Sequence, residues 1–369
     1  MAGKKRQANF ELLRILAMFM VVIMHFLARS SVMQESRRDS LYVFGTVTES
    51  LCICAVNVYV LISGYFLSAA DVSWKRVIRL IAQTLFYTLL IPVVLVLAGQ
   101  MELGSAVGIY QIWPAVFPVQ SGQYWFVSAY VVMSIFSPCL NAALEKLDQK
   151  KTKQMLAALL LFFCVGKTWS ILQFSTDKYG YDFGWFMVLY LIGGYIRRYG
   201  VGFFTNKKRS AAVYLVSAGV IACAELVLNL LAEKIEGLRY YSSVPYHYNF
   251  LFCLTGALGL FFLFYHMNIK EGRMAEIIRL VSPAVLGVYL IHEHWQVKDL
   301  WFGWVNGLFS KIGLGVPMSN GVLTQMAVVP YAFVMLLEVL TVFVICIVID
   351  KLRNLLFVKI EAALSGRRK

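Results

Sequence analysis

The stretch NFELLRILAMFMVVIMHF, residues 9–26, is apolar enough and long enough to cross a membrane as a helix, yet it contains an arginine and a histidine. A charge in hydrocarbon costs at least ~2.5 kcal/mol, so both residues need a partner or a function. The eleven residues from Arg14 to His25 turn a helix to within about 20° of whole turns, with Met18 and Val21 on the same stripe. This spacing predicts one helix face with Arg14 near a membrane surface and His25 about 16 Å deeper.

The composition predicts an all-α integral membrane protein. The 369 residues are 60% hydrophobic and only 15% charged, and their mean hydropathy is +0.69. We therefore expect a single polytopic membrane domain over residues 1–369, with a basic cytoplasmic tail at about 351–369. Arg14 and His25 argue against a cleaved signal peptide, whose apolar region should be uncharged. About ten transmembrane helices are predicted, at 9–28, 42–67, 77–99, 122–143, 155–173, 183–199, 210–231, 247–267, 280–296 and 325–349.

The basic residues predict the orientation of the chain. Of the 34 lysines and arginines, 24 fall in segments that are cytoplasmic if the N-terminus is inside, 8 fall in the opposite segments, and Arg14 and Lys167 fall within helices. Both termini are therefore expected in the cytoplasm. The same distribution explains the net charge of +14 without a nucleic-acid partner. The seven cysteines have no metal-ligand spacing, so neither a metal nor a disulfide framework is expected.

A second group of candidate residues, Lys75, Arg76 and Arg79, lies at the cytoplasmic start of the predicted third helix. Arg76 and Arg79 share a helix face at an N-terminus, where phosphates are favoured. A positive-inside signal explains these residues equally well. Simpler interpretations also stay open for the first helix, since Arg14 could extend to the cytoplasmic surface and His25 could hydrogen bond between helices.

Further polar residues lie within apolar helices. In VNVYVLISGYFL, residues 56–67, Asn57 is polar in mid-helix, and Ser63 with Gly64 permits close approach of a helix or a ligand. Glu338, near the middle of the last helix, could pair with Arg14 or orient His25. The aromatic residues at 240–248 fit either an interfacial belt or a sugar-stacking surface.

The segment GVYLIHEHW, residues 287–295, places His292, Glu293 and His294 toward the outer end of the predicted ninth helix. Residues i and i+2 lie 200° apart on a helix, so His292 and His294 cannot chelate one metal there, and the string is not the HExxH zinc signature. His292 has a depth similar to that of His25, so the two could line one cavity.

The chain resembles the acyltransferase-3 family of membrane acyltransferases, closest to its exopolysaccharide and cell-surface glycan O-acetyltransferase branch. The resemblance covers essentially the whole chain. It rests on Arg14 followed by His25, on the R-x-x-R of Arg76 and Arg79, and on three longer segments. These are VNVYVLISGYFL, WFVSAYVVMSIFSP at 125–138 and SPAVLGVYLIH at 282–292.

The resemblance implies transfer of an acetyl or other short acyl group from cytoplasmic acetyl-CoA to a hydroxyl of an extracytoplasmic glycan or glycolipid. It implies His25 as the catalytic general base with Arg14 as its partner, and a multi-pass protein of the bacterial cytoplasmic membrane. Many relatives carry aspartate where this chain has Asn57, so Glu338 or Glu49 would have to orient the histidine here. Donor-contact candidates are Lys75, Ser63, Arg76 and Arg79; cavity-lining candidates are Asn57, Tyr59, Trp125, His292 and Glu338.

Three questions stay open at this point. A transporter or exporter of a polysaccharide or small solute is the alternative from another class, and a non-glycan acceptor is the alternative within the family. A covalent acyl-histidine intermediate competes with direct transfer. The lipid bilayer is the expected partner, and a homo-oligomer is compatible with the sequence.

Overall fold

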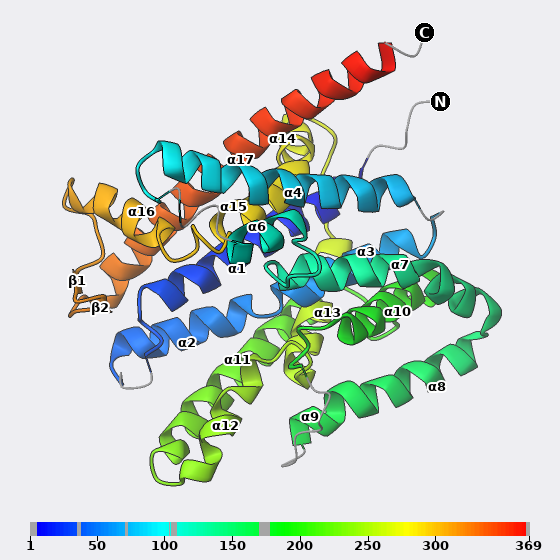
Figure 1. Cartoon of the computed structure of the whole chain (residues 1–369). Helices are drawn as coiled ribbons and strands as arrows, with labels where there is room; N and C mark the ends of the chain where they lie inside the picture. The colour runs from blue at the N-terminus through cyan, green and yellow to red at the C-terminus, as the bar shows by residue number, and fades with distance from the viewer. Residues whose placement is uncertain are drawn as a thin grey trace.

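The computed structural model describes residues 6–34, 38–70, 73–102, 104, 109–169 and 178–366. Over these ranges the chain is a bundle of helices with one short hairpin, and the start of α1 and the end of α17 point to the same side of the molecule (Figure 1). The helices of the first half are α1 (Ala8–Arg29), α2 (Ser40–Cys52), α3 (Ala55–Leu67), α4 (Trp74–Leu97), α6 (Ile109–Val116), α7 (Trp125–Lys146), α8 (Gln149–Leu160), a π-helical turn η1 (Leu161–Val165), α9 (Gly166–Trp169) and α10 (Phe183–Tyr199).

The second half continues the bundle and ends in a long helix. Met318 pairs with Leu323 and Ser319 with Val322 in the antiparallel hairpin. The elements are α11 (Lys207–Ala232), η2 (Glu236–Leu238), α12 (Arg239–Ser242), η3 (Val244–Tyr246), α13 (Leu251–Tyr265), α14 (Arg273–Val281), η4 (Ser282–Ala284), α15 (Val285–His292), α16 (Trp301–Ser310), β1 (Met318–Ser319), β2 (Val322–Leu323) and α17 (Val328–Gly366).

Eight helical segments of the described chain are long and apolar enough to cross a membrane, so this is a multi-pass membrane protein. The two predicted spans outside this set are 155–173 and 183–199. The first falls in α8, η1 and α9, which begin with a basic turn and are broken by the π turn, and its residues 170–173 lie outside the described residues. The second is α10, which has 17 residues. The count of ten and the cytoplasmic side of the termini therefore stay predictions.

Two predicted helices differ in detail from the structure. The span 42–67 is interrupted by a turn at Ile53 and Cys54, between α2 and α3. The span 280–296 ends at His292, because the backbone leaves the helix at Glu293, where ψ is 10°. The predicted tail at 351–369 is helical as far as Gly366, since α17 continues through it without a break.

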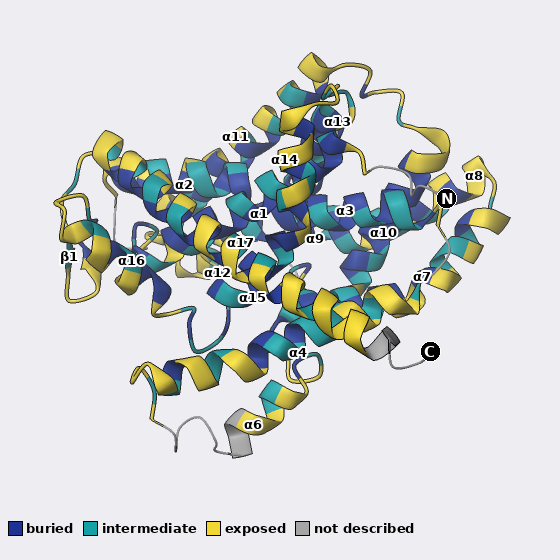
Figure 2. Ribbon diagram, turned by 90° about the horizontal axis from the view of Figure 1, so that it is seen from above, coloured by how far each residue is buried: buried dark blue, intermediate teal, exposed yellow. Residues whose placement is uncertain are grey.

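The first helix lies in the middle of the bundle. It packs against α2, α3, α13, α14, α15 and α17, and buried residues concentrate on it and its neighbours, whereas α4 and α6 lie at the edge with exposed outer faces (Figure 2). Helices α3 and α10 touch through their backbones. A Cβ on Gly64 would lie 2.3 Å from the Tyr190 carbonyl oxygen, and one on Gly193 would lie 2.6 Å from that of Leu61. Only glycine allows this approach, so the predicted role of Gly64 in close helix contact is confirmed.

Candidate active site

A cavity of about 830 Å³ runs along α1 and is enclosed by α3, α4, α7, α10 and the η4–α15 segment. Arg14, Met18, Val21 and His25 all line it, as the predicted stripe requires. The α1 face that carries Arg14 and His25 is thus one wall of a cavity.

One end of the cavity is strongly basic. In the described part of the chain, Arg6, Arg14, Arg76 and Arg197 line it, together with the carboxylate of Glu11. This excess of positive charge favours an anionic ligand. We call it the basic end.

Arg14 is held in place by its own helix. Its guanidinium is paired with the buried carboxylate of Glu11, which also accepts a hydrogen bond from the Ser282 hydroxyl. The Tyr59 hydroxyl donates to the Arg14 carbonyl oxygen at 2.6 Å, and the guanidinium lies 5.8 Å from the centre of the Phe66 ring. Arg14 therefore keeps a fixed position while its side chain stays a quarter exposed to the cavity.

The three basic candidates on α4 separate in the structure. Arg76 lines the cavity, whereas Arg79 is exposed and lies 3.3 Å from the Glu361 carboxylate on α17. Lys75 is exposed and is not part of the cavity wall. Arg197, from the end of α10, joins Arg76 there and donates to the Tyr65 hydroxyl at 3.1 Å.

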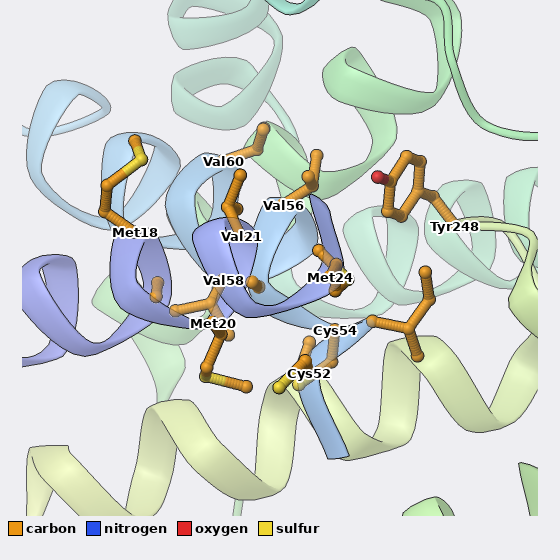
Figure 3. Close-up of a cluster of buried hydrophobic side chains, with 14 of the residues drawn as sticks. Met18, Met20, Val21, Met24, Cys52, Cys54, Val56, Val58, Val60 and Tyr248 are labelled. Carbon is orange, nitrogen blue, oxygen red and sulfur yellow. The ribbon is translucent and has the colours of Figure 1, made fainter. Parts of the chain in front are cut away.

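Between the two ends the cavity wall is mostly apolar. Figure 3 shows Met18, Val21 and Met24 of α1 beside Val56 of α3, with the Tyr248 ring at the edge of the same cluster. Ser63 also lines the wall and accepts a hydrogen bond from Tyr130 at 3.1 Å. Such a wall excludes water from whatever occupies the cavity.

At the other end, His25 contacts both His292 and Glu293. Its Nδ1 lies 2.8 Å from His292 Nε2 and 3.2 Å from a Glu293 carboxylate oxygen. His292 Nδ1 lies 2.5 Å from the Val288 carbonyl oxygen, which can only accept, so that nitrogen carries the proton and His292 Nε2 is an acceptor. His25 Nδ1 must then be the donor. In neutral His25 the remaining nitrogen, Nε2, keeps its lone pair and is available as a base.

Glu293 is positioned by the end of α1. Arg29 lies 3.4 Å from the Glu293 carboxylate and donates to the Lys298 carbonyl oxygen at 2.8 Å. Burial raises the pKa of Glu293 to about 7, against the opposing charges of Arg29 and Lys298, which lower it. The carboxylate beside His25 therefore changes its charge near neutral pH.

His25, His292 and Glu293 each offer a ligand atom, and these atoms lie within 4.8 Å of one another, so the group could hold a metal ion. The sequence predicts no metal site. The distance between the two nitrogens is 2.8 Å, a hydrogen-bond length, whereas two imidazoles on one tetrahedral zinc stand about 3.4 Å apart. We therefore describe the group as a hydrogen-bonded one.

The remaining candidates do not contact His25 through any hydrogen bond seen in the described residues. Asn57 donates to the Tyr248 carbonyl oxygen at 2.7 Å and accepts from Trp185 Nε1 at 3.0 Å. Glu338 is fully buried in α17. Neither of its carboxylate oxygens has a hydrogen-bond partner among the described residues. No hydrogen bond or ion pair joins Glu49 to His25 in the described chain, whereas Glu293 lies 3.2 Å from His25 Nδ1. The expectation that Glu338 or Glu49 orients His25 is corrected by the structure, which puts Glu293 there, because α15 ends at His292 and turns the next residue toward α1.

Several residues of the site, among them Glu11, Arg197 and Glu293, have no role assigned from the sequence. Glu11 could have been found from its position three residues before Arg14, the spacing of a helical ion pair. Arg197 was counted only as a topology signal, and no local pattern separates it from Arg198. Glu293 was noted in the sequence but taken to continue a helix.

The cavity therefore has arginines at one end and a histidine with an available ring nitrogen at the other, inside a membrane domain. A family model described as an acyltransferase domain matches residues 7–350, and the chain belongs to this family, the acyltransferase-3 family. No curated protein and no solved structure was found to match the chain.

Proposed function

We propose that this membrane acyltransferase transfers an acetyl or other short acyl group from cytoplasmic acyl-CoA to a hydroxyl of an extracytoplasmic polysaccharide or lipid-linked glycan. The observation that carries the proposal is one continuous cavity with four arginines at its basic end and the free nitrogen of His25 at the other. An acyl-CoA is a long molecule with several phosphate charges at one end and a reactive thioester at the other. Its shape and charge match the cavity.

The basic end would bind the phosphates of the donor. Arg76 and Arg197 offer exposed guanidinium groups there, and Arg14, fixed by Glu11, would contact the part of the donor that enters the apolar section. Ser63 and Tyr59 line the path between the ends. On the positive-inside prediction this end faces the cytoplasm, where acyl-CoA is available.

At the other end, His25 would act as general base. His25 Nε2 would take the proton of the acceptor hydroxyl while the hydroxyl oxygen attacks the thioester carbonyl carbon. The carbon–sulfur bond then breaks, and the CoA thiolate leaves and takes up the proton from the imidazolium. His292 Nε2 accepts the Nδ1 proton and holds the ring in the required tautomer, and the Glu293 carboxylate, 3.2 Å from Nδ1, favours the imidazolium.

The proposed function is tested with the purified full-length chain in lipid nanodiscs. Acetyl-CoA labelled in the acetyl group is supplied with glycan acceptors, and the products are analysed by mass spectrometry. We expect a labelled ester on the glycan and release of free CoA. A label found only on a lipid headgroup or a peptide would show that this molecule, and not a glycan, is the acceptor. Transport of glycan without ester formation would overturn the proposal.

The acceptor in the cell is identified by mass spectrometry of the surface glycan with and without the gene. We expect the loss of one acyl ester when the gene is deleted. A His25→Ala gene should fail to restore it, and an unchanged ester in that strain would remove His25 from the mechanism.

A further inference from the structure

Three aromatic side chains from three separate segments stack together near the His25 end of the cavity. Trp125 begins α7, Tyr181 precedes α10 and Tyr248 precedes α13. The ring centres of Trp125 and Tyr248 are 5.5 Å apart with 22° between their planes. Tyr181 lies 4.5 Å from Trp125 and 4.6 Å from Tyr248. We call these three residues the aromatic cluster.

The aromatic cluster extends from the protein surface to the cavity wall. Trp125 and Tyr248 line the same cavity as His25, whereas Tyr181 does not line it and is 43% exposed. A purely interfacial tyrosine would turn its ring to the lipid. Here the ring instead packs on Trp125 and Tyr248, two rings of the cavity wall.

The position of the cluster is fixed by the surrounding backbone. Tyr248 donates its backbone N–H to the Tyr179 carbonyl oxygen at 3.0 Å, and its own carbonyl oxygen accepts from Asn57 at 2.7 Å. Gly180 has a φ of +79°, and a Cβ there would lie 2.8 Å from Asn249 N. The two loops that carry Tyr181 and Tyr248 are therefore joined before any ligand binds, so binding would cost little ordering entropy.

A polar group without a partner lies close by in the sequence. Gln123, two residues before Trp125, has both its amide nitrogen and its amide oxygen buried, with no hydrogen-bond partner among the described residues. A buried amide without partners costs free energy unless a ligand supplies the missing hydrogen bonds. Aromatic side chains suit a sugar ring, whose axial C–H groups face the aromatic ring while its hydroxyls hydrogen bond to polar groups.

We infer that the aromatic cluster is the acceptor subsite of the proposed transferase and that it binds a pyranose ring. The inference rests on the proposed function and narrows its acceptor to a cyclic sugar. A linear alcohol has no flat apolar face to stack on Trp125 and Tyr181. A sugar held there would present its hydroxyl toward the cavity that His25 lines.

Binding is measured by saturation-transfer NMR on the full-length protein. The protein is held in phosphatidylglycerol nanodiscs, because maltoside detergents would compete for the subsite. The probes are methyl β-D-glucopyranoside and methyl β-D-galactopyranoside, with sorbitol as an acyclic control. We expect saturation of the sugar ring protons and none of sorbitol. Tyr181→Ala and Trp125→Leu should each weaken binding about fivefold, whereas Tyr181→Phe, which keeps the ring, should stay within about twofold.

Tyr199→Ala is the matched control. Tyr199 is the same residue type with a similar exposed fraction, 38%, and lies at the opposite end of α10 from Tyr181. In the transfer assay, Tyr181→Ala should raise the KM for the pyranoside about fivefold and leave the KM for acetyl-CoA unchanged.

The outcomes separate this inference from the proposed function. If the wild type binds neither pyranoside, or if the Tyr181 and Trp125 variants bind as tightly as the wild type, the inference is overturned, whether or not acyl transfer occurs. If no acyl transfer is found but pyranoside binding depends on Tyr181 and Trp125, the subsite stands and the proposed chemistry fails.

Discussion

The two ends of the cavity are built on different principles. At the basic end, Arg6 and Arg14 come from the start of the chain, Arg76 from α4 and Arg197 from α10; Arg14 is paired with the buried Glu11, whereas Arg76 and Arg197 are exposed. At the His25 end, His25 Nδ1 is hydrogen bonded to His292 Nε2, and His292 Nδ1 is hydrogen bonded to the Val288 carbonyl oxygen. The first arrangement tolerates movement of a flexible polyanion, and the second fixes one proton on one nitrogen. This difference predicts that separate mutations can weaken donor binding or slow the transfer step.

The largest effect should come from His25→Ala. Loss of the base should lower kcat by about 10²- to 10⁴-fold, while the Kd for acetyl-CoA stays within about twofold, because the donor phosphates bind at the other end. The measurement is steady-state transfer together with calorimetric titration of acetyl-CoA. His266→Ala, at a histidine bonded to the Phe204 carbonyl oxygen and outside the cavity wall, is the control. Equal losses of activity in the two variants would contradict the assignment.

His292→Phe should have the next largest effect. This substitution removes the acceptor of the His25 proton and leaves a ring of similar size, so we expect kcat to fall about 10- to 100-fold with unchanged KM for acetyl-CoA. Thermal unfolding of the variant in nanodiscs shows whether the fold is intact. Full activity in a folded variant would mean that His292 does not position His25.

Arg76→Ala combined with Arg197→Ala should act only at the basic end. We expect the KM for acetyl-CoA to rise about tenfold and kcat to change little, since two charge-assisted contacts with phosphate would be lost at a partly solvated site. Arg79→Ala is a matched control on the same helix, because Arg79 pairs with Glu361 and does not line the cavity. If Arg79→Ala has the larger effect, the arginines lining the cavity are not the donor contacts.

Glu293→Gln should have the smallest effect, visible mainly in the pH profile. The pKa of Glu293 is raised to about 7 by burial, so its carboxylate is mostly neutral below this pH and mostly charged above it. The charged form favours the imidazolium of His25, and kcat should therefore rise a few-fold as the pH increases through about 7. Glu293→Gln should abolish that rise. A variant that keeps the same inflection would show that another group titrates.

The helical periodicity of residues 9–26 was sufficient to predict that Arg14 and His25 share one face, because that relation is local. The partner of His25 was not predictable in the same way. Glu293 is 268 positions further along the chain, and it reaches His25 because α15 ends at His292, four residues before the end of the predicted span. Likewise the R-x-x-R spacing could not show that Arg79 turns to α17, since that depends on how α4 packs.

The overall class was the easier part of the prediction. Composition and apolar spacing are enough to predict a helical membrane bundle, since hydrocarbon leaves few alternatives for the backbone. The identity of the cavity wall depends on contacts between distant helices. Sequence patterns therefore supplied a set of polar candidates, and only the fold separated Arg76 from Arg79 and Glu293 from Glu338.

The backbone contact between α3 and α10 has a mechanical consequence. With Gly64 against Tyr190 and Gly193 against Leu61, these two helices cannot slide or separate without breaking a close-packed seam, so they behave as one stiff body. The helix α4 is held differently, by hydrogen bonds from Gln83 and Tyr87 to the buried Asp350 of α17 at 2.9 and 2.8 Å, and 28% of its most apolar window is buried, compared with 67% for α1. We therefore expect a bulky ligand that passes in or out to displace α4, which carries Arg76, more than α3 and α10.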